Sequence, residues 1–416
     1  MALPSPVVAA VVGEPSDTAC LRFEVADVVR AHGQEYLRTH ATSSEQRKVL
    51  RAIAACRTQA LGGHVEQCEG CSYRRITYNS CRNRHCPKCQ GKERAQWMAA
   101  EQAMLLPVPY FHVVFTLPHA LNPLMRVNQR QLYGMLFRVA AATLRTFALD
   151  PRHLGAEPAI TMVLHTWGQT LEEHYHVHCV VSGGGLSLDG RHWVALPKRK
   201  RRRPFLFHVK ALSKVFCAKF ISALKRARRS NALRYVGQSG ALQQPGVWKQ
   251  LIHDLCKQPW VVYSKPPFGG PEQVLKYLSR YTHRIAISNR RILSVSNGIV
   301  RFEYRDYADH NKRKEMSLPA TEFLRRFLLH VVPTGFMRIR HYGITANCQR
   351  RSKLARCREI FAQPKPSAVS ATQTIAATES SAAAAEDCVA IRCPACGGIM
   401  RVIEILAPTP GSYDTS

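Results

Sequence analysis

The sequence has 416 residues, 59 Lys and Arg against 28 Asp and Glu, and a formal net charge of +31 at pH 7. A chain of this length can form two or three domains with at least one sizeable core. So large a positive charge indicates an anionic partner, of which nucleic acid is the commonest. No stretch has the length of apolar residues that spans a bilayer, which argues against a membrane protein.

The cysteine usage and the N-terminus indicate the compartment. The opening residues MALPSPVVAAVVGEP lack a basic leader, so we predict no signal peptide and take the cytoplasm as the location. The chain has 15 cysteines, several of them in Cys-x-x-Cys pairs. In a long intracellular chain this pattern indicates metal binding rather than disulfides.

The first half of the chain contains helical signals and then strands. Residues 22–60 are predicted to be helical, with a serine N-cap and Glu45 in the first turn of TSSEQRKVLRAIAACRTQAL, and the glycines at 62–63 are expected to end the helix. A cysteine-rich segment follows at 64–90. Alternating apolar residues predict strands over 108–118 and 159–167, with a helix over 124–147 between them.

The second half is more basic. The run KRKRRR at 198–203 precedes a predicted helix, VKALSKVFCAKFISALKRARRS, and residues 284–307 are predicted to form a hairpin that turns at Asn297-Gly298. Residues 362–386 are of low complexity and predict a disordered linker, which is followed by a last small piece with CPACGG. Helices and strands alternate without the regular spacing of a parallel sheet, so we predict the α+β class.

The cysteine-rich segment predicts a zinc site. In CEGCSYRRITYNSCRNRHCPKC two Cys-x-x-Cys pairs are separated by 14 residues, close to the usual spacing of a zinc ribbon. We therefore predict that Zn²⁺ is bound by Cys68, Cys71, Cys86 and Cys89. Cys81 and His85 are surplus, and either could replace one ligand. The CPAC at 393–396 is half a site, which Cys388 could help to complete.

Histidines recur at every second position in LEEHYHVHCVVSGGG, residues 171–185. On a strand His174, His176 and His178 share one face, with neighbours about 7 Å apart. Two neighbours can bind one ion, whereas the third cannot reach it unless the strand bends, and Gln169 or His174 are the nearest candidates for a third ligand. The alternative is a solvated or hydrogen-bonded strand edge. An open site with two imidazoles suits a catalytic divalent cation.

Two tyrosines follow in FGGPEQVLKYLSRYTHR, residues 268–284, after a Gly-Gly-Pro-Glu helix start. Tyr277 and Tyr281 are four residues apart, which places them about 6 Å apart on one helix face. Tyrosines packed in a core are the alternative interpretation. The nearby cations Arg280 and Arg284 lower the cost of forming a phenolate, and tyrosine is a known covalent nucleophile.

With these motifs the chain resembles the two-tyrosine rolling-circle transposases of bacterial insertion sequences (the insertion-sequence ninety-one group), members of the HUH endonuclease superfamily. The matching stretches run in family order from about residue 20 to 350: CRTQALGGH, SCRNRHCPKCQ, FHVVFTLP, HTWGQTLEEHYHVHCVVSGGGLS, KYLSRYTHRIAISNRRI and RIRHYG. The family's His-hydrophobic-His motif falls on His176 and His178, and its Tyr-x-x-x-Tyr motif on Tyr277 and Tyr281. Tyr175 stands where proline is usual and Ser72 where glycine is usual, but neither removes a ligand or a nucleophile.

The resemblance implies an N-terminal helical and zinc-ribbon module, followed by an HUH-type antiparallel-sheet catalytic domain with flanking helices. The implied boundaries are a tail over 1–20, a DNA-binding domain with the ribbon over 21–104 and the catalytic domain over 105–350. A basic segment and disordered linker over 351–387 and a C-terminal cysteine knuckle and tail over 388–416 complete the chain.

The resemblance also implies a chemistry. Mg²⁺ or Mn²⁺ on the histidine pair would polarise a scissile phosphate of single-stranded DNA, and a tyrosine would attack it, leaving a 5′-phosphotyrosine and a free 3′-hydroxyl. A second tyrosine would allow a second cleavage while the first adduct waits. The covalent link retains the ester energy, so no ATP is expected, in keeping with the lack of a GxxxxGK[ST] loop in the sequence. The expected partner is DNA at transposon ends and targets, at the bacterial nucleoid and without a membrane, and the oligomeric state stays open.

Basic residues near these motifs are expected to contact phosphates without reading sequence. The candidates are Lys198, Arg199, Arg280, Arg284, Arg338 and Arg340. For the run at 198–203 a solvated charged loop is an equal alternative.

Three other functions compete with a transposase. A plasmid replication initiator or relaxase would use the same chemistry, but the N-terminal cysteine ribbon favours the transposase. A zinc-ribbon DNA-binding regulator would leave the histidine pair inert, which the paired tyrosines argue against. A zinc hydrolase could use the histidine strand with Glu172 or Glu173 as general base, but it would not need so large a positive charge.

Overall fold

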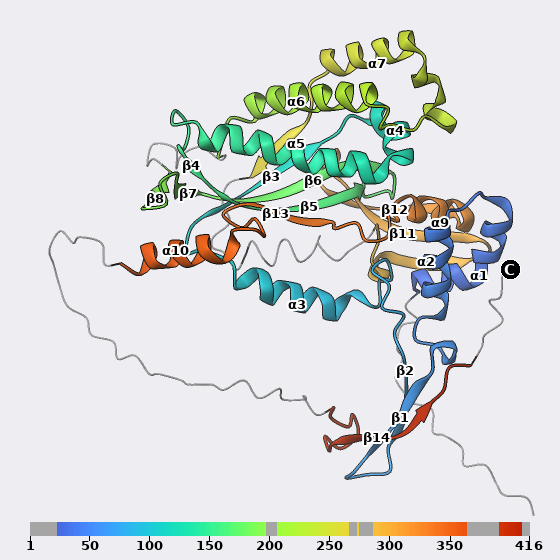
Figure 1. The fold of residues 1–416 in the computed structure, drawn as a ribbon. Helices are drawn as coiled ribbons and strands as arrows, with labels where there is room; N and C mark the ends of the chain where they lie inside the picture. The colour runs from blue at the N-terminus through green and yellow to red at the C-terminus, as the bar shows by residue number, and fades with distance from the viewer. Residues whose placement is uncertain (1–22, 197–205, 266–272, 274–285, 364–390, 410–416) are drawn as a thin grey trace, which may run out of the picture.

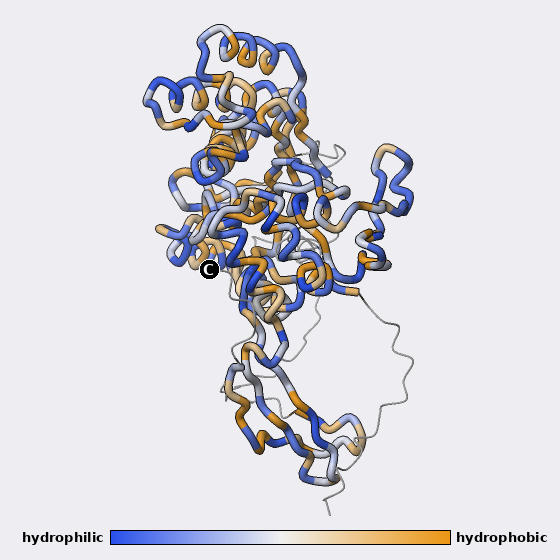
Figure 2. Tube along the Cα trace, turned by 90° about the vertical axis from the view of Figure 1, so that its right-hand side faces the viewer, coloured by the Kyte–Doolittle hydropathy of each residue, from blue (hydrophilic) through white to orange (hydrophobic). Residues whose placement is uncertain are grey.

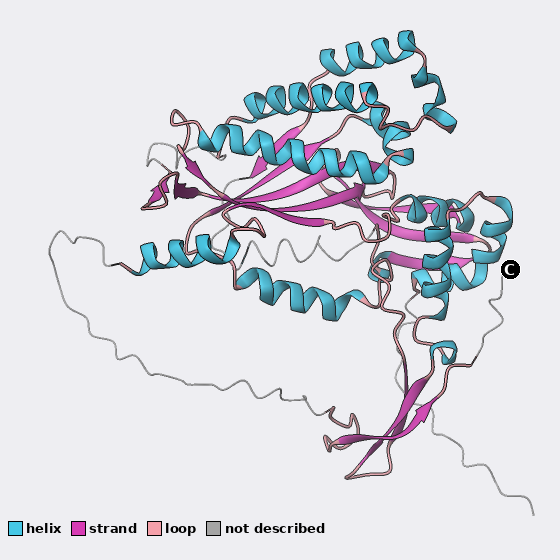
Figure 3. Ribbon diagram, in the orientation of Figure 1, coloured by secondary structure: helices cyan, strands magenta, loops and turns pink. Residues whose placement is uncertain are grey.

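The structure is a computed structural model, and it describes residues 23–196, 206–265, 273, 286–363 and 391–409. Helices pack on antiparallel sheets, and the two kinds of element do not alternate as in a parallel α/β fold (Figure 3). The predicted α+β class is therefore confirmed.

A five-stranded sheet forms the centre of the molecule. Its strands pair antiparallel throughout, in the order β13-β5-β6-β3-β9. The bounds are β3 (Tyr110–Thr116), β5 (Ala159–Trp167), β6 (Glu173–Ser182), β9 (Val262–Lys265) and β13 (Ile339–Gly343). The predicted strands over 108–118 and 159–167 and the histidine strand are thus neighbours in one sheet.

Helices cover both faces of the central sheet (Figure 1). One face packs in the largest apolar core against α4 (Asn122–Val127), α5 (Gln129–Leu149), α6 (Val209–Arg229) and α7 (Pro245–Lys257). A smaller apolar cluster on the other face includes residues of α3 (Gln90–Gln102) and α10 (Arg350–Ala362). In β6 the odd-numbered side chains from Tyr175 to Val181 face the larger core, so the even-numbered histidines face the opposite side.

The helix α5 is long and apolar enough, by length and composition, to cross a membrane. However, 72% of its most apolar window is buried inside the structure, where it packs between α6 and the central sheet. It is therefore explained as the main core helix of the fold.

A second core joins the N-terminal helices to a region that follows the central sheet strand β9 in the chain. It packs α1 (Val25–Thr39) and α2 (Ser44–Ala55) against α9 (Ala320–Leu329) and the sheet β10-β11-β12. The strands of that sheet are β10 (Ile292–Ser296), β11 (Ile299–Asp306) and β12 (Lys312–Pro319). Asn297 and Gly298 both have positive φ, at 50° and 72°, and connect β10 to β11, so the predicted hairpin turn is confirmed.

A third sheet projects from this body (Figures 1 and 2). It has the order β14-β1-β2, in which β1 (Gly63–Cys68) and β2 (Arg74–Tyr78) form a hairpin and β14 (Met400–Leu406) adds from the C-terminal end. A small fourth sheet consists of β4 (Ala156–Glu157), β7 (Gly184–Ser187) and β8 (Trp193–Ala195). Short 3₁₀ helices lie at Gln59–Leu61, His119–Leu121, Gly237–Gln243 and Asn289–Arg291.

Two predicted helix bounds were wrong. The serine N-cap is confirmed at Ser43, whose hydroxyl accepts from the Gln46 amide, but the helix ends at Ala55, well before the glycines. Those glycines instead allow close strand approach, because a Cβ at Gly62 or Gly63 would lie 2.5 Å from a neighbouring backbone oxygen. The helix expected over 124–147 is broken at Asn128, which has φ −121°.

The domain boundaries expected along the chain stay a prediction, but the described contacts cross them. β14, from the expected C-terminal piece, pairs with β1 of the expected zinc-ribbon domain. α9, from the expected catalytic domain, packs on α1. The basic run at 198–203 lies outside the described residues, as does the low-complexity segment from residue 364 onward.

Candidate functional site

Three histidines meet on one face of the central sheet. His176 and His178 lie on β6, and His165 lies on β5 directly opposite His176. Their ligand nitrogens all lie within 4.8 Å of one another, and the Nε2 atoms of His176 and His178 are 3.1 Å apart. This is the spacing at which imidazoles can share one metal ion.

All three imidazoles are buried, and burial keeps at least His176 and His178 in the neutral form that can bind a metal. Their exposed fractions are 2%, 8% and 7% for His165, His176 and His178. Burial lowers the pKa of His176 to about 3 and the pKa of His178 well below its usual value, so both are neutral at pH 7. Only a neutral imidazole has a lone pair to give to a metal.

Hydrogen bonds orient two of the rings. Nδ1 of His176 donates to the His174 carbonyl at 2.7 Å, which leaves Nε2 as the ligand atom. Nδ1 of His178 lies 2.9 Å from Nε2 of His112, a buried histidine of the neighbouring strand β3. With the His178 hydrogen on Nδ1, its Nε2 also points its lone pair toward the ion site.

The sequence did not single out His165. His174 and Gln169 were the candidates for a third ligand, and the structure brings neither into the group. The His174 ring lies 4.9 Å from that of His176, measured between centroids, and the Gln169 amide donates to the Tyr307 hydroxyl. The signal that could have found His165 is the β5–β6 hairpin register, which places it opposite His176.

The two carboxylates considered for a hydrolase are held elsewhere. Glu173 lies on the face of β6 opposite the histidines and forms an ion pair with Arg126, while the Tyr175 hydroxyl donates to it at 2.6 Å. Glu172 pairs with Arg326 at 3.3 Å. Neither glutamate is placed to act as a general base at the three histidines.

The predicted nucleophiles cannot be placed. Tyr277 and Tyr281 lie outside the described residues, as do Arg280 and Arg284 of the same segment and Lys198 and Arg199 of the basic run. Lys265 ends the last described strand before this segment and pairs with His112, and apart from residue 273 the described residues continue from Ala286.

The four cysteines expected at one zinc ion are not brought together. Cys86 and Cys89 join Cys56 and Cys81, whereas Cys68 joins Cys71, Cys393 and Cys396. The reason is the β1–β2 hairpin. Its base is the open end, where Gly63 pairs with Tyr78, and Cys81 lies three residues after Tyr78. The strand β1 runs from this base and places Cys68 about 17 Å away from it, at the other end of the hairpin. The structure thus corrects the grouping that the sequence spacing suggested.

The cluster at the hairpin base has the chemistry of a structural zinc site. Cys56 caps the C-terminus of α2, and Cys89 precedes α3. The Sγ atom of Cys89 lies 3.4 Å from that of Cys56 and 3.5 Å from that of Cys81, and all four sulfurs lie within 4.8 Å. Four thiolates at this spacing fit a closed tetrahedral site. Cys56 was missed because it has no partner nearby in the sequence.

His85, the other surplus candidate, points away from that cluster. Its Nε2 accepts the backbone N–H of Val332 at 3.2 Å, and its Nδ1 lies 3.2 Å from the Asn83 side-chain oxygen. Both ring nitrogens are therefore used in hydrogen bonds that fix the loop of 83–86 against the body.

Two of the predicted phosphate contacts are described, and both are partly buried. The guanidinium of Arg340 packs 4.6 Å and 5.0 Å from the ring centroids of Phe137 and Phe336. Arg338 is half-buried, and burial and the nearby charge of Arg84 lower its pKa. The Arg340 side chain thus packs against two aromatic rings of the protein, and its contact with DNA stays a prediction.

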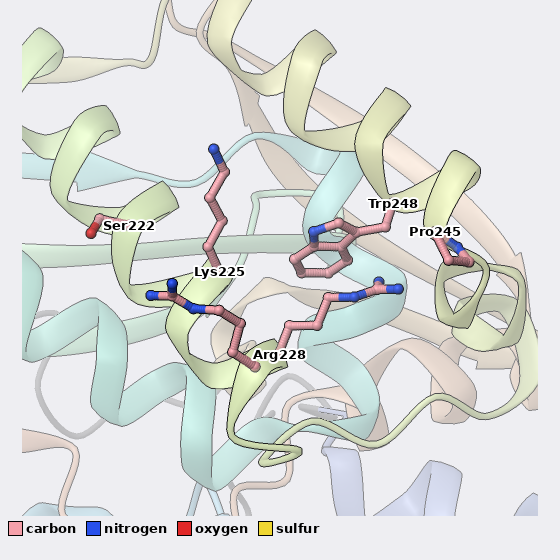
Figure 4. A pocket seen from close by; sticks show the side chains of 6 residues that line it. Ser222, Lys225, Arg228, Pro245 and Trp248 are labelled. Atoms are coloured by element: carbon pink, nitrogen blue, oxygen red, sulfur yellow. The ribbon is translucent and has the colours of Figure 1, made fainter.

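A basic pocket of about 350 Å³ lies between α6 and α7 (Figure 4). The Arg228 guanidinium stacks 4.5 Å from the centroid of the Trp248 ring and donates to the carbonyls of Leu242 and Gln243. Lys225 and Arg229 are exposed beside it. A pocket with exposed cations is suited to the phosphates of a nucleic acid.

Comparison with known proteins identifies the family. A family described as "Putative transposase" matches residues 159–353, and a "Transposase zinc-binding domain" matches residues 28–117. The "Putative transposase y4qJ" of Sinorhizobium fredii (strain NBRC 101917 / NGR234) is 46% identical over 398 residues, 94% of this chain and 98% of that protein. The "Transposase for insertion sequence element IS801" of Pseudomonas savastanoi pv. phaseolicola is 30% identical over 306 residues, 72% of this chain and 70% of that protein.

Among solved structures, the conjugative relaxase TrwC in complex with OriT DNA, in a metal-free structure, is similar at a TM-score of 0.21 and 14% identity. That match covers 60% of this chain and 71% of the relaxase. The two sequence families span the zinc-binding segment and the strands that carry the three histidines, and the relatives match along most of their length. The chain therefore belongs to the family of insertion-sequence transposases that carry an N-terminal zinc-binding domain.

Proposed function

We propose that this transposase cleaves and rejoins single-stranded DNA at the ends of its insertion sequence through 5′-phosphotyrosine intermediates, and so drives rolling-circle transposition. Tyr277 and Tyr281 are the proposed nucleophiles, and His165, His176 and His178 are the proposed ligands of a divalent cation. The observation that carries the proposal is the convergence of three buried imidazoles from adjacent strands.

The histidine group fits a catalytic rather than a structural ion. Three protein nitrogens leave coordination positions open for water or for a phosphate oxygen. Of the two cations expected, Mn²⁺ suits this ligand set better, because Mg²⁺ prefers oxygen ligands and keeps most of its water. A bound cation would supply charge stabilisation to the phosphate as its negative charge rises.

The proposed roles of the chain's own residues follow from this site. The three histidines and their hydrogen-bond partners fix where the scissile phosphate can sit. The hydroxyl oxygen of one tyrosine bonds to the phosphorus as the bond from phosphorus to the 3′ oxygen breaks. The phenolic proton passes to solvent, and the leaving 3′ oxygen takes up a proton.

Rejoining is the same reaction in reverse, with a 3′-hydroxyl attacking the phosphotyrosine. One phosphoester replaces another at each step, so the reaction needs no nucleotide hydrolysis. The second tyrosine allows a second strand to be cleaved while the first remains attached. Transfer of a strand from donor to target requires this pair of linked cleavages.

The test is a covalent adduct on a denaturing gel. The full-length protein is incubated with Mn²⁺ and a labelled single strand that carries the insertion-sequence end. We expect an adduct with the wild type and with each single variant, Tyr277→Phe or Tyr281→Phe, and none with the double variant. Phe retains the ring and removes only the nucleophilic oxygen. Tyr263→Phe, at an exposed tyrosine of β9, is the matched control and should form the adduct normally.

A normal adduct with the double variant would place the nucleophile elsewhere and reject the proposal. His176→Ala or His178→Ala should abolish the adduct but leave DNA binding within a factor of about three, because the ion acts on the transition state rather than on docking. Cleavage that releases both DNA ends without an adduct would indicate hydrolysis instead.

A further inference from the structure

Two Cys-x-x-Cys turns from opposite ends of the chain lie face to face in the projecting sheet. Cys68 ends β1, Cys71 follows it, and Cys393 and Cys396 precede β14. The Sγ atoms of Cys68 and Cys396 are 3.4 Å apart, and those of Cys71 and Cys393 are 3.7 Å apart. We propose that these four cysteines bind one structural zinc ion, which joins the C-terminal strand to the N-terminal hairpin.

The spacing of the sulfurs fits this ion. A tetrahedral zinc with bonds of about 2.3 Å holds its sulfurs about 3.8 Å apart. All four sulfurs lie within 4.8 Å of one another, so a small contraction around the ion completes the tetrahedron. The same distances exceed the roughly 2.05 Å of a disulfide, and the four cysteines are not bonded to one another.

The backbone around the sulfurs is shaped to enclose an ion. The Gly70 amide donates to the Cys68 sulfur at 3.3 Å, as backbone amides do around metal thiolates. A Cβ at Gly398 would lie 3.1 Å from the Cys68 sulfur and 3.3 Å from the Cys396 sulfur, so a larger residue would crowd the site. Gly397 has a φ of +74°, which lets the second turn close onto Cys393.

Backbone pairing holds the two turns together. The Glu69 amide donates to the Ile399 carbonyl at 3.0 Å, across from one turn to the other. β14 then pairs with β1 from Met400 to Leu406, in antiparallel register with one irregularity. The two halves of the site are thus aligned by the strands that extend from them.

The sheet has too little core to be stable without such an ion. Among the described residues, its buried apolar cluster consists of Cys68, Cys393 and Met400, with Cys71 packed at the side. Large apolar side chains on β14 remain exposed, with Val402 at 56% and Ile405 at 83%. Figure 2 shows hydrophobic residues along this sheet, although few of them are buried. Isolated two- or three-stranded sheets without a core are marginal, and small modules of this kind fold with their metal.

This site is separate from the cluster of Cys56, Cys81, Cys86 and Cys89, so the chain should bind two zinc ions. The zinc ion would therefore link two segments that are far apart in the sequence, the hairpin near residue 70 and the segment near residue 395. The zinc-binding domain is then completed only after the segment with Cys393 and Cys396 has been made.

The experiment measures the zinc content of the purified full-length protein by inductively coupled plasma mass spectrometry. We expect about two zinc ions per chain for the wild type, and about one for the double variant Cys393→Ser/Cys396→Ser. The matched control is Cys256→Ser/Cys348→Ser, at two exposed cysteines outside both clusters, which should keep both ions. The variant Cys86→Ser should lose the zinc of the cluster at the hairpin base and keep the zinc of the projecting sheet. Loss of zinc from one cluster can therefore be told apart from loss from the other.

Amide hydrogen exchange supplies the structural readout. Loss of this zinc should speed exchange of the β1 amides that pair with β14, while β5 and β6 keep their protection. Unchanged zinc content in the Cys393→Ser/Cys396→Ser variant would overturn the proposal. So would iron in place of zinc, a Cys68–Cys396 disulfide in the intact mass, or loss of zinc without a change in β1 exchange.

Discussion

His112 should set the metal affinity of the histidine site without touching the ion. Its Nε2 is 2.9 Å from Nδ1 of His178, and both rings are buried. When Nε2 of His178 binds the metal, its Nδ1–H needs an acceptor, and His112 supplies it. His112→Leu leaves that buried donor unpaired, at a cost of about 1–3 kcal/mol. At 1.4 kcal/mol for each factor of ten, the cation should bind about 5- to 140-fold more weakly.

The assay is calorimetric titration of Mn²⁺ into the zinc-loaded protein at pH 7.5, with adduct formation measured in parallel. His112→Gln should recover much of the affinity, because its side-chain oxygen can accept the same hydrogen bond. Saturating Mn²⁺ should restore most of the adduct with His112→Leu, as expected for a residue that positions a ligand. His341→Leu is the control, because it removes another partly buried imidazole on β13, outside the metal group.

Wild-type Mn²⁺ affinity in His112→Leu would refute this reasoning. Equal losses in the Leu and Gln variants would also do so, because they would show that packing rather than the hydrogen bond matters. A loss of affinity in His341→Leu of the same size would point to a general weakening of the sheet.

Three further experiments, with five variants, test other parts of the structure. His165→Ala should weaken Mn²⁺ binding by at least about 100-fold, whereas His174→Ala should change it less than about tenfold; the reverse order, read by the same titration, would exchange their roles. Burial lowers the pKa of His330 to about 4. As the pH falls, this histidine therefore takes up a proton in the unfolded chain before it does so in the folded protein. Its contribution to stability is complete above about pH 6.5 and is lost as the pH falls toward 4. Between pH 7.5 and 5.0 the free energy of unfolding, measured with urea, should therefore fall by about 2 kcal/mol less in His330→Gln than in the wild type. An equal fall in both proteins would contradict this. Lys225→Ala and Arg229→Ala should each reduce the slope of log binding constant against log salt for single-stranded DNA by about 0.7, and unchanged slopes would remove the pocket from the DNA path.

Local signals were sufficient for much of the fold. The Ser43 cap, the alternating strands and the Asn297-Gly298 turn each depend on residues close in the sequence, and the structure contains all three. The histidine strand was recognised for the same reason, because alternation at period two does not depend on distant residues. The location of Tyr277 and Tyr281 stays a prediction.

The composition of the metal clusters could not be predicted in the same way. His165 joins the group through strand register, and Cys56 through the path of the chain after α2. Cys393 meets Cys71 only because β14 pairs with β1, across more than 300 residues of sequence. Spacing rules assume that ligands near one another in the sequence bind the same ion. Here a hairpin lies between the two Cys-x-x-Cys pairs and places them in different clusters.

The second core sets the order in which this protein can fold during synthesis. α1 and α2 end at Ala55, but the sheet and helix that cover their apolar faces begin at Ile292. At a synthesis rate of about 5–20 residues per second, the intervening stretch of about 240 residues takes roughly 10–50 seconds to appear. During that time the two helices are outside the ribosome without their native partner. They are then open to capture by chaperones, and the N-terminal part of the molecule matures only after four strands of the central sheet, β3, β5, β6 and β9, have been made.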